Sequence, residues 1–247
     1  MTKVLVHGVP ETAAVWDRLI EHLSSRDVIA LQLPGFGDPL PEGFDATKES
    51  YVEWLVRELE SLGADEPLDV VGHDWGGGFV VRLVSTRPEL VRSWVVDTAA
   101  MGSGAFEWHS IAKVWQTPGA GEDFFAGLAS VPPEAASGAY ASQGVPAEDA
   151  VEMAAGIDAT MATAILALYR SAVDVGVEWS PDFRDIEPPG LALVPSEDPF
   201  IGAERSRHGA GESGATIVEL PGLGHWWMLQ APEVVGPILE EFWAGLG

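Results

Sequence analysis

The stretch from Leu68 to Thr86 constrains the fold of this chain more than any other. It opens with a short apolar run, passes through Gly-His-Asp-Trp-Gly-Gly-Gly at residues 72–78, and continues as an apolar segment that ends before Pro88. This order predicts a strand, a sharp turn and a helix, with Asp74 at the tip of the turn. The glycines permit positive φ angles and allow the helix to approach the strand closely.

The turn gives Asp74 a chemical interpretation as well as a structural one. A carboxylate that faces the N-terminus of a helix is kept ionised by free N–H groups and the helix dipole, which suits a nucleophile. The spacing Gly72-x-Asp74-x-Gly76 is that of a nucleophile elbow, where serine is the more usual residue at the tip. An ordinary glycine-rich turn is the alternative, and the remainder of the chain has to decide between the two.

Composition narrows the class of protein and its partners. The 247 residues, of which 47% are hydrophobic, suffice for one α/β domain with an insertion or for two small domains. The sequence contains no apolar run long enough to span a bilayer, no signal-peptide pattern at its start and no cysteine. We therefore expect a cytoplasmic protein without disulfides or thiolate metal sites. The net charge of −25 argues against nucleic acid and anionic membranes as partners.

Short apolar strands alternate with helical segments at the start of the chain and again near its end. Strands are predicted at residues 3–6, 27–31, 68–71, 91–96, 190–194 and 215–220. Helical spacing is found at residues 13–23, 50–62, 77–86 and 232–243. This alternation indicates the α/β class, with a doubly wound, mostly parallel sheet that helices cover on both faces.

The alternation is interrupted after Met101. The helical stretches expected there are residues 106–114, 123–129 and 147–173, separated by clusters of Gly, Pro and Ser. We predict no buried strand in this part of the chain. Residues 101–186 would then form an all-helical insertion between two parts of the core, residues 1–100 and 187–247.

Polar residues follow several of the predicted strands, where the active crevice of a parallel sheet lies. His7, Asp74 and Asp97 each come directly after a strand. His225 lies on a glycine-flanked loop after the last strand, and Asp198 lies on the loop after the strand before it. A nucleophile, an acid and a base thus occur in chain order, and the acid could orient the base.

Three motifs together resemble those of one superfamily. They are the elbow at residues 72–77, the turn His7-Gly8-Val9-Pro10 and the loop Leu33-Pro34-Gly35-Phe36-Gly37. They are similar to the α/β-hydrolase fold, and in particular to its epoxide hydrolase and haloalkane dehalogenase branch. The resemblance implies a sheet of about six strands, with the two strands that usually open the fold missing, and a helical cap formed by the insertion. The sheet edge left uncovered is a candidate surface for a homodimer.

The resemblance implies a two-step hydrolysis. Asp74 attacks an sp³ carbon and forms an alkyl-enzyme ester, which water activated by His225 then cleaves. The backbone N–H groups of Val9 and Trp75 match the oxyanion hole of the family. No metal or cofactor is implied, and the six histidines include no HxH or HExxH spacing typical of zinc sites. The reactants are then a small hydrophobic molecule and water.

Two acids compete for the role of orienting His225. We expect Asp198, because its loop matches the commoner arrangement in the resembled family. Asp97 occupies the position that some dehalogenases use and is the alternative.

The leaving group separates the two activities of the resembled branch. An epoxide needs a proton donor for its opening oxygen, usually a cap tyrosine, and Tyr169 is a stronger candidate here than Tyr140. A halide needs N–H donors, but Trp75 occurs in both families, and Val9 replaces the Asn or Glu of many haloalkane dehalogenases. We therefore expect an epoxide hydrolase first and a haloalkane or haloacid dehalogenase second.

Five residues are expected to line the substrate pocket, with core packing as the alternative for each. They are His7, Trp108, His109, Tyr140 and Trp226. A third hypothesis is a scaffold that has lost hydrolysis and serves as a binding protein, isomerase or cyclase. The complete set of Asp74, Asp198 and His225 disfavours it.

Overall fold

Six short strands form one parallel sheet in the computed structural model, which describes residues 1–63, 66–104, 106–184 and 186–247. All neighbouring strands run parallel, in the order β2-β1-β3-β4-β5-β6. The strands are β1 (Lys3–Val6), β2 (Val28–Leu31), β3 (Leu68–Gly72), β4 (Val91–Val96), β5 (Gly190–Pro195) and β6 (Thr216–Leu220). The predicted α/β class with a parallel sheet of six strands is confirmed.

Helices cover both faces of the sheet because successive strand residues point to opposite sides. In β1, Val4 packs into the core beneath α2 and α3, whereas Leu5 packs into a second core beneath α1, α12 and α13. Val70 and Val71 alternate in the same way in β3, and all four side chains are fully buried. The helices of the core are α1 (Asp17–Glu21, after a 3-10 turn at Ala13–Trp16), α2 (Lys48–Leu62), α3 (Trp75–Thr86), α11 (Ala203–Ser213), α12 (Trp227–Gln230) and α13 (Pro232–Ala244).

The order of the strands brings the ends of β1 and β3 together. The chain passes from β1 to β2 on one side and returns across β1 to β3 on the other, so the direction of winding reverses between β1 and β3. Val6 of β1 lies in register with Gly72 of β3. The residues that follow these two strands, Val9 and Asp74 among them, therefore meet at the carboxyl edge, where parallel sheets bind ligands.

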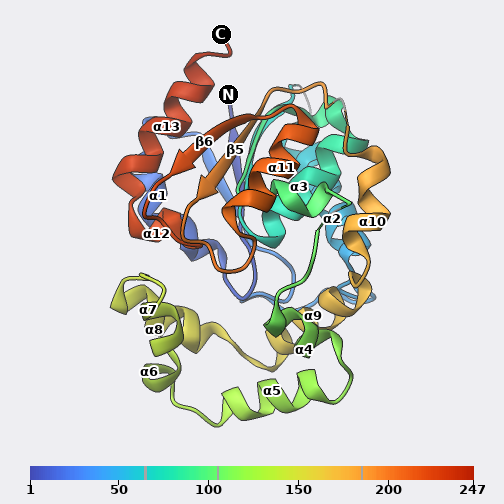
Figure 1. Ribbon diagram of the computed structural model, residues 1–247, viewed down its shortest axis with the longest axis vertical. Coiled ribbons are helices and arrows are strands. Elements are labelled where there is room, and N and C mark those ends of the chain that lie inside the picture. The colour runs from blue at the N-terminus through green and yellow to red at the C-terminus, as the bar shows by residue number, and fades with distance from the viewer. Residues whose placement is uncertain (64–65, 105, 185) are drawn as a thin grey trace.

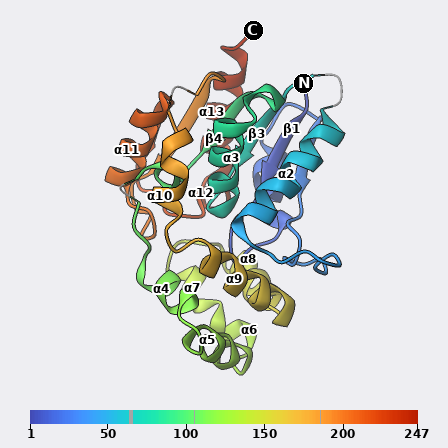
Figure 2. The same ribbon diagram turned by 90° about the vertical axis from the view of Figure 1, so that its right-hand side faces the viewer.

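Between β4 and β5 the described residues form helices and turns. Figure 1 shows most of these helices gathered beyond the carboxyl edge of the sheet, and Figure 2 shows α10 beside the core near α3. We call α4–α9 the cap. The helices are α4 (Ser110–Gln116), α5 (Ala120–Ala129), α6 (Pro133–Ala136), α7 (Gly138–Ala141), α8 (Ala147–Gly156), α9 (Ala159–Ser171) and α10 (Val175–Trp179).

The prediction of one long helix over residues 147–173 is wrong, because two helices occupy this segment. α8 ends at Gly156 and α9 begins at Ala159, with a bend of 83° between them. Gly156 weakens the helix, and the Asp158 carboxylate accepts a hydrogen bond of 2.8 Å from the N–H of Met161, which starts a new one. No single helix of the described residues has the length and hydropathy to cross a membrane, and α8 and α9 meet that criterion only as this bent pair.

Other element boundaries also differ from the prediction. The helix expected from residue 106 begins at Ser110, because His109 Nδ1 accepts the N–H of Ala112 at 3.2 Å and caps the first turn. The short helices α6 and α7 occupy part of the Gly/Pro/Ser-rich stretch, and Tyr140 lies on α7. The sequence pattern did not indicate α11 or α12 either.

Candidate active site

Asp74 lies at the tip of the predicted elbow in a strained backbone conformation. Its φ and ψ angles are 49° and −120°, a combination that non-glycine residues rarely adopt. The neighbours have to be small for the turn to fit. A Cβ on Gly76 would lie 2.2 Å from the carbonyl oxygen of Val6, and a Cβ on Gly8 would lie 2.4 Å from Cβ of Asp74. The strain and the tight packing hold the carboxylate at the carboxyl edge of the sheet.

The two oxygens of the Asp74 carboxylate have different partners. Oδ1 accepts a hydrogen bond of 2.9 Å from the N–H of Val9, and the N–H of Trp75 also hydrogen-bonds this carboxylate. Oδ2 lies 3.7 Å from Nε2 of His225. Oδ1 is therefore held by the backbone of Val9, while Oδ2 faces the base.

Burial raises the pKa of Asp74 to about 6, although the charges of His225 and His73 oppose this shift. The carboxylate is thus ionised at neutral pH but is a better base than an exposed aspartate. A nucleophile with little hydration is the more reactive for it.

Asp198 is the acid that contacts His225. Its Oδ2 lies 2.9 Å from Nδ1 of the imidazole, and its Oδ1 accepts the N–H groups of Phe200 and Ile201 at 2.7 and 3.3 Å. Burial would raise the pKa of Asp198, but the charge of His225 and these hydrogen bonds lower it to about 2. An ionised carboxylate at Nδ1 fixes the tautomer with a proton there and leaves Nε2 facing Asp74 as the base.

Asp97, the alternative acid, has other partners. Its Oδ1 accepts the N–H of Asp74 at 3.1 Å, and its Oδ2 contacts Nδ1 of His73 at 2.5 Å and the indole N–H of Trp227 at 2.7 Å. It therefore supports the elbow and the residue before the nucleophile instead of the predicted base.

Sequence reasoning missed two residues of the buried site, Glu11 and His73. Glu11 Oε1 lies 3.0 Å from Nε2 of His73 and accepts the indole N–H of Trp226 at 2.5 Å, while Oε2 accepts the N–H of Gly8 at 3.0 Å. One signal was present: both are ionisable residues that follow β1 and β3 at the carboxyl edge. Glu11, His73 and His225 each offer a ligand atom within 4.8 Å of the others, but those of Glu11 and His73 already form these hydrogen bonds and are not free for a metal.

A cavity of about 160 Å³ lies between the cap and the elbow. Asp74 and His225 form part of its wall, and the remainder is predominantly apolar and aromatic. Its lining residues are Val9, Pro10, Asp74, His109, Ile111, Trp115, Phe124, Phe125, Leu128, Ala136, Ala139, Tyr140, Gln143, Ala154, Ile157, Tyr169, Phe200, His225 and Trp226. Gln143 and Phe200 were not predicted, since nothing in the sequence relates their loops to the elbow.

Of the five residues expected in the pocket, His109, Tyr140 and Trp226 line the cavity. His7 and Trp108 are not among the described lining residues. His7 is fully buried below the site, where its Nε2 accepts the N–H of Leu33 at 3.1 Å. Trp108 turns its indole N–H to the carbonyl of Ala172 at 2.9 Å. Both residues are corrections to the expected cavity lining, because the polar atoms of their side chains form hydrogen bonds with the backbone.

Tyr169 comes from α9 and reaches the same cavity as Asp74. Its ring packs edge-on against Trp75 and Trp115, with centroids 5.6 and 4.8 Å away. Burial and the charge of Asp74 raise the pKa of Tyr169 well above its usual value, so the hydroxyl stays protonated. Tyr140 lies elsewhere on the wall, edge-on to Trp226 at 5.3 Å.

Comparison with known proteins agrees with this architecture. Residues 4–236 match the Alpha/beta hydrolase family. The chain belongs to the alpha/beta hydrolase family. Among curated relatives, an (E)-2-((N-methylformamido)methylene)succinate hydrolase of Acinetobacter baylyi is 33% identical over 94 residues, which are 38% of this chain and 35% of that protein. The alignments span about a third to a half of the first curated relatives.

Solved structures of alpha/beta hydrolases resemble the whole chain. A haloalkane dehalogenase from Bradyrhizobium elkani superposes with a TM-score of 0.77 at 18% identity, over 99% of this chain and 90% of that one. An epoxide hydrolase from Vigna radiata superposes with a TM-score of 0.78 at 20% identity, over 99% of this chain and 91% of that one. At such identities the likeness establishes the fold, and the chemistry has to be argued from the site.

Proposed function

We propose that this alpha/beta hydrolase opens an epoxide on a small, mostly apolar molecule through an alkyl ester on Asp74. The arrangement of the Asp74 carboxylate carries the proposal. Oδ1 is held by the N–H of Val9 at 2.9 Å, Oδ2 faces Nε2 of His225 at 3.7 Å, and Tyr169 and Tyr140 line the same cavity as Asp74. An aspartate nucleophile suits an alkyl carbon, because the ester formed remains hydrolysable at its carbonyl.

In the first step, Oδ2 of Asp74 attacks one epoxide carbon, and the bond from that carbon to the epoxide oxygen breaks. The oxygen takes the phenolic proton of Tyr169, which is neutral until that moment because of its raised pKa. The product is a hydroxyalkyl ester of Asp74 with Tyr169 as phenolate.

In the second step, His225 removes a proton from a water molecule, and the resulting hydroxide attacks the ester carbonyl of Asp74. The 3.7 Å between Nε2 and Oδ2 is longer than a direct hydrogen bond, so Nε2 does not form a hydrogen bond with the carboxylate. The N–H groups of Val9 and Trp75 stabilise the tetrahedral oxyanion. Its collapse breaks the ester bond, and the leaving alkoxide takes the proton of the carboxyl group formed on Asp74, which gives the diol and the free carboxylate. The proton on His225 is returned to the Tyr169 phenolate, so the sum is epoxide plus water to diol.

The cavity limits the substrate. A volume of about 160 Å³ corresponds to a benzene-sized molecule, which an apolar cavity of about 150 Å³ accommodates. Styrene oxide combines a ring of that size with an epoxide. It is therefore the first substrate to test.

The covalent intermediate provides the test. His225→Gln should accumulate an adduct on Asp74 equal to the mass of styrene oxide, detected by intact-protein and peptide mass spectrometry, because the ester forms but water is not activated. A second variant that also carries Asp74→Asn should show no adduct. If the wild type yields diol while His225→Gln traps nothing, the ester route is wrong.

Dehalogenation is the second candidate, favoured by one observation at Trp115. Its indole Nε1 is buried and has no hydrogen-bond partner among the described residues, although the side chain lines the cavity. An N–H donor of this kind, with the Tyr169 hydroxyl, could hold a halide. Incubation with 1-bromobutane separates the two activities, because bromide release without diol formation from styrene oxide would select the dehalogenase.

A further inference from the structure

A second set of ionisable side chains lies directly behind the proposed triad. Glu11, His73 and Asp97 are each at most 1% exposed, and they come from the loop after β1, the elbow and the end of β4. His73 lies between the two carboxylates, with Nδ1 2.5 Å from Asp97 and Nε2 3.0 Å from Glu11. A neutral imidazole carries one N–H and can donate to one carboxylate only, so both contacts require a doubly protonated ring.

The carboxylates have no proton to share, because donors already surround them. Glu11 accepts from the N–H of Gly8 and the indole of Trp226, and Asp97 accepts from the N–H of Asp74 and the indole of Trp227. A proton on either acid would make one of its oxygens a donor, and that donor would face N–H groups that now donate to the carboxylate. The positive charge therefore belongs to His73, held between two negative charges.

This charge faces the two groups that would carry the reaction. The ring of His73 lies 4.6 Å from the ring of His225, centroid to centroid, and Asp74 is the next residue in the chain. The charge of His73 acts to lower the pKa of both groups, against the burial that raises the pKa of Asp74 and the Asp198 charge that raises the pKa of His225. His7 is a further titratable neighbour of His73, and burial keeps its pKa low, at about 4. Tyr140 and Tyr169 also feel the charge of Glu11, and burial raises the pKa of both.

We propose that His73 is a permanent imidazolium, held between Glu11 and Asp97, that positions the elbow and opposes a second positive charge on the neighbouring ring of His225. It is a positioning residue, because it is not one of the described residues that line the cavity. Its assignment as imidazolium rests on the geometry alone, whereas its benefit to the reaction rests on the proposed function of Asp74 and His225.

The protonation of His73 can be read without any substrate. Nitrogen-15 NMR of histidine-labelled protein should show one imidazole with protons on both nitrogens from about pH 5 to pH 9, and this signal should be absent in His73→Gln. A His73 with a single protonated nitrogen at neutral pH would overturn the proposal, because the proton would then lie on Glu11 or Asp97. Failure of the epoxide assay would leave this result unaffected.

The influence on the base is a separate measurement. In His73→Gln the NMR titration of His225 should move to higher pH than in the wild type, whereas His208→Gln, which removes an exposed imidazole on α11, should leave it in place. If His73→Gln does not fold, Glu11→Gln is the second variant: the His73 signal should then titrate within the range in which the wild type does not. An unchanged His225 titration in folded His73→Gln, or an unchanged His73 in Glu11→Gln, would contradict the proposal.

Discussion

At the scale of single residues, the site depends on how Asp74 and His225 share protons. Asp74 is buried against a base 3.7 Å away, yet it has to be ionised, while the base has to be neutral. Each group has a partner of its own: the N–H of Val9 holds the Asp74 carboxylate, and Asp198 holds the His225 imidazole. The backbone N–H groups favour the ionised form of Asp74, whereas Asp198 orients His225 while its charge raises the pKa of that imidazole.

Activity should fall on the acid side for two reasons. Burial raises the pKa of Asp74 to about 6, so attack on substrate should slow as the pH falls through about 6 and the carboxylate takes up a proton. Burial lowers the pKa of His225, but the charge of Asp198 raises it by more, so hydrolysis of the ester should also slow as the pH falls. Rapid-quench mass spectrometry of the wild type resolves the two steps. An adduct-formation rate that does not change between about pH 5 and pH 7 would contradict the first part.

The two candidate acids should fail in different steps. Asp198→Asn removes the charge at Nδ1 of His225, so the adduct on Asp74 should still form while its hydrolysis slows about 10³-fold. Asp97→Asn disturbs the elbow N–H and His73, so adduct formation itself should slow. Time courses of the adduct distinguish the two effects. Fast hydrolysis in Asp198→Asn together with a stalled adduct in Asp97→Asn would reverse the assignment.

At the scale of elements, strands were predictable because burial on both faces produces compact apolar runs between turns. All six strands were placed within two residues of their observed bounds. The helical stretch after residue 147 was predictable, but its break was not. The effect of Gly156 followed by a capping Asp158 is local and small, and the apolar spacing continues across it.

The elbow, the last loop and Asp198 could be placed because each follows a strand. The pairing of Glu11 with His73 could not, since it depends on which loops meet in space.

The break between α8 and α9 should depend on Asp158. Replacing it with alanine removes the side-chain acceptor for the N–H of Met161, which should lower the free energy of unfolding by about 1 kcal/mol. Asp158→Asn is the matched control, because asparagine caps equally well. Its free energy of unfolding should stay within about 0.3 kcal/mol of the wild-type value. Thermal unfolding of the three proteins measures the difference. Equal stability of wild type and Asp158→Ala would mean that packing of α9, and not its cap, starts the helix.

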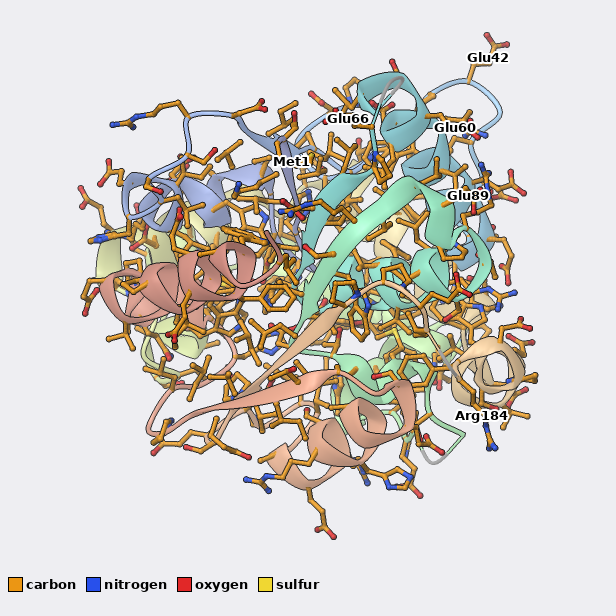
Figure 3. All side chains as sticks on the ribbon, turned by 90° about the horizontal axis from the view of Figure 1, so that it is seen from above. Met1, Glu42, Glu60, Glu66, Glu89 and Arg184 are labelled. Atoms are coloured by element: carbon orange, nitrogen blue, oxygen red, sulfur yellow. The ribbon has the colours of Figure 1, made fainter. Side chains whose placement is uncertain are left out.

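At the scale of the whole molecule, buried and exposed charges behave differently. Inside, every carboxylate of the site and its supporting network is matched by a histidine or by N–H donors. Outside, the 38 acidic residues outnumber the 13 basic ones. Figure 3 shows Glu42, Glu60 and Glu89 on the periphery, and the last two share Arg87 as their partner. The fold therefore has to tolerate considerable repulsion between its surface charges.

Salt should stabilise this protein. Raising NaCl from about 10 to about 100 mM shortens the screening length from about 30 to about 10 Å, which weakens repulsion among the surface carboxylates. The melting temperature should rise by a few degrees, because the surface ion pairs weakened at the same time are worth about 0–1 kcal/mol each. Glu42→Lys, which changes an exposed acid, should melt higher than the wild type at low salt, and the difference should shrink at high salt. A melting temperature that falls with salt would mean that the surface ion pairs, and not the excess of negative charge, dominate the stability.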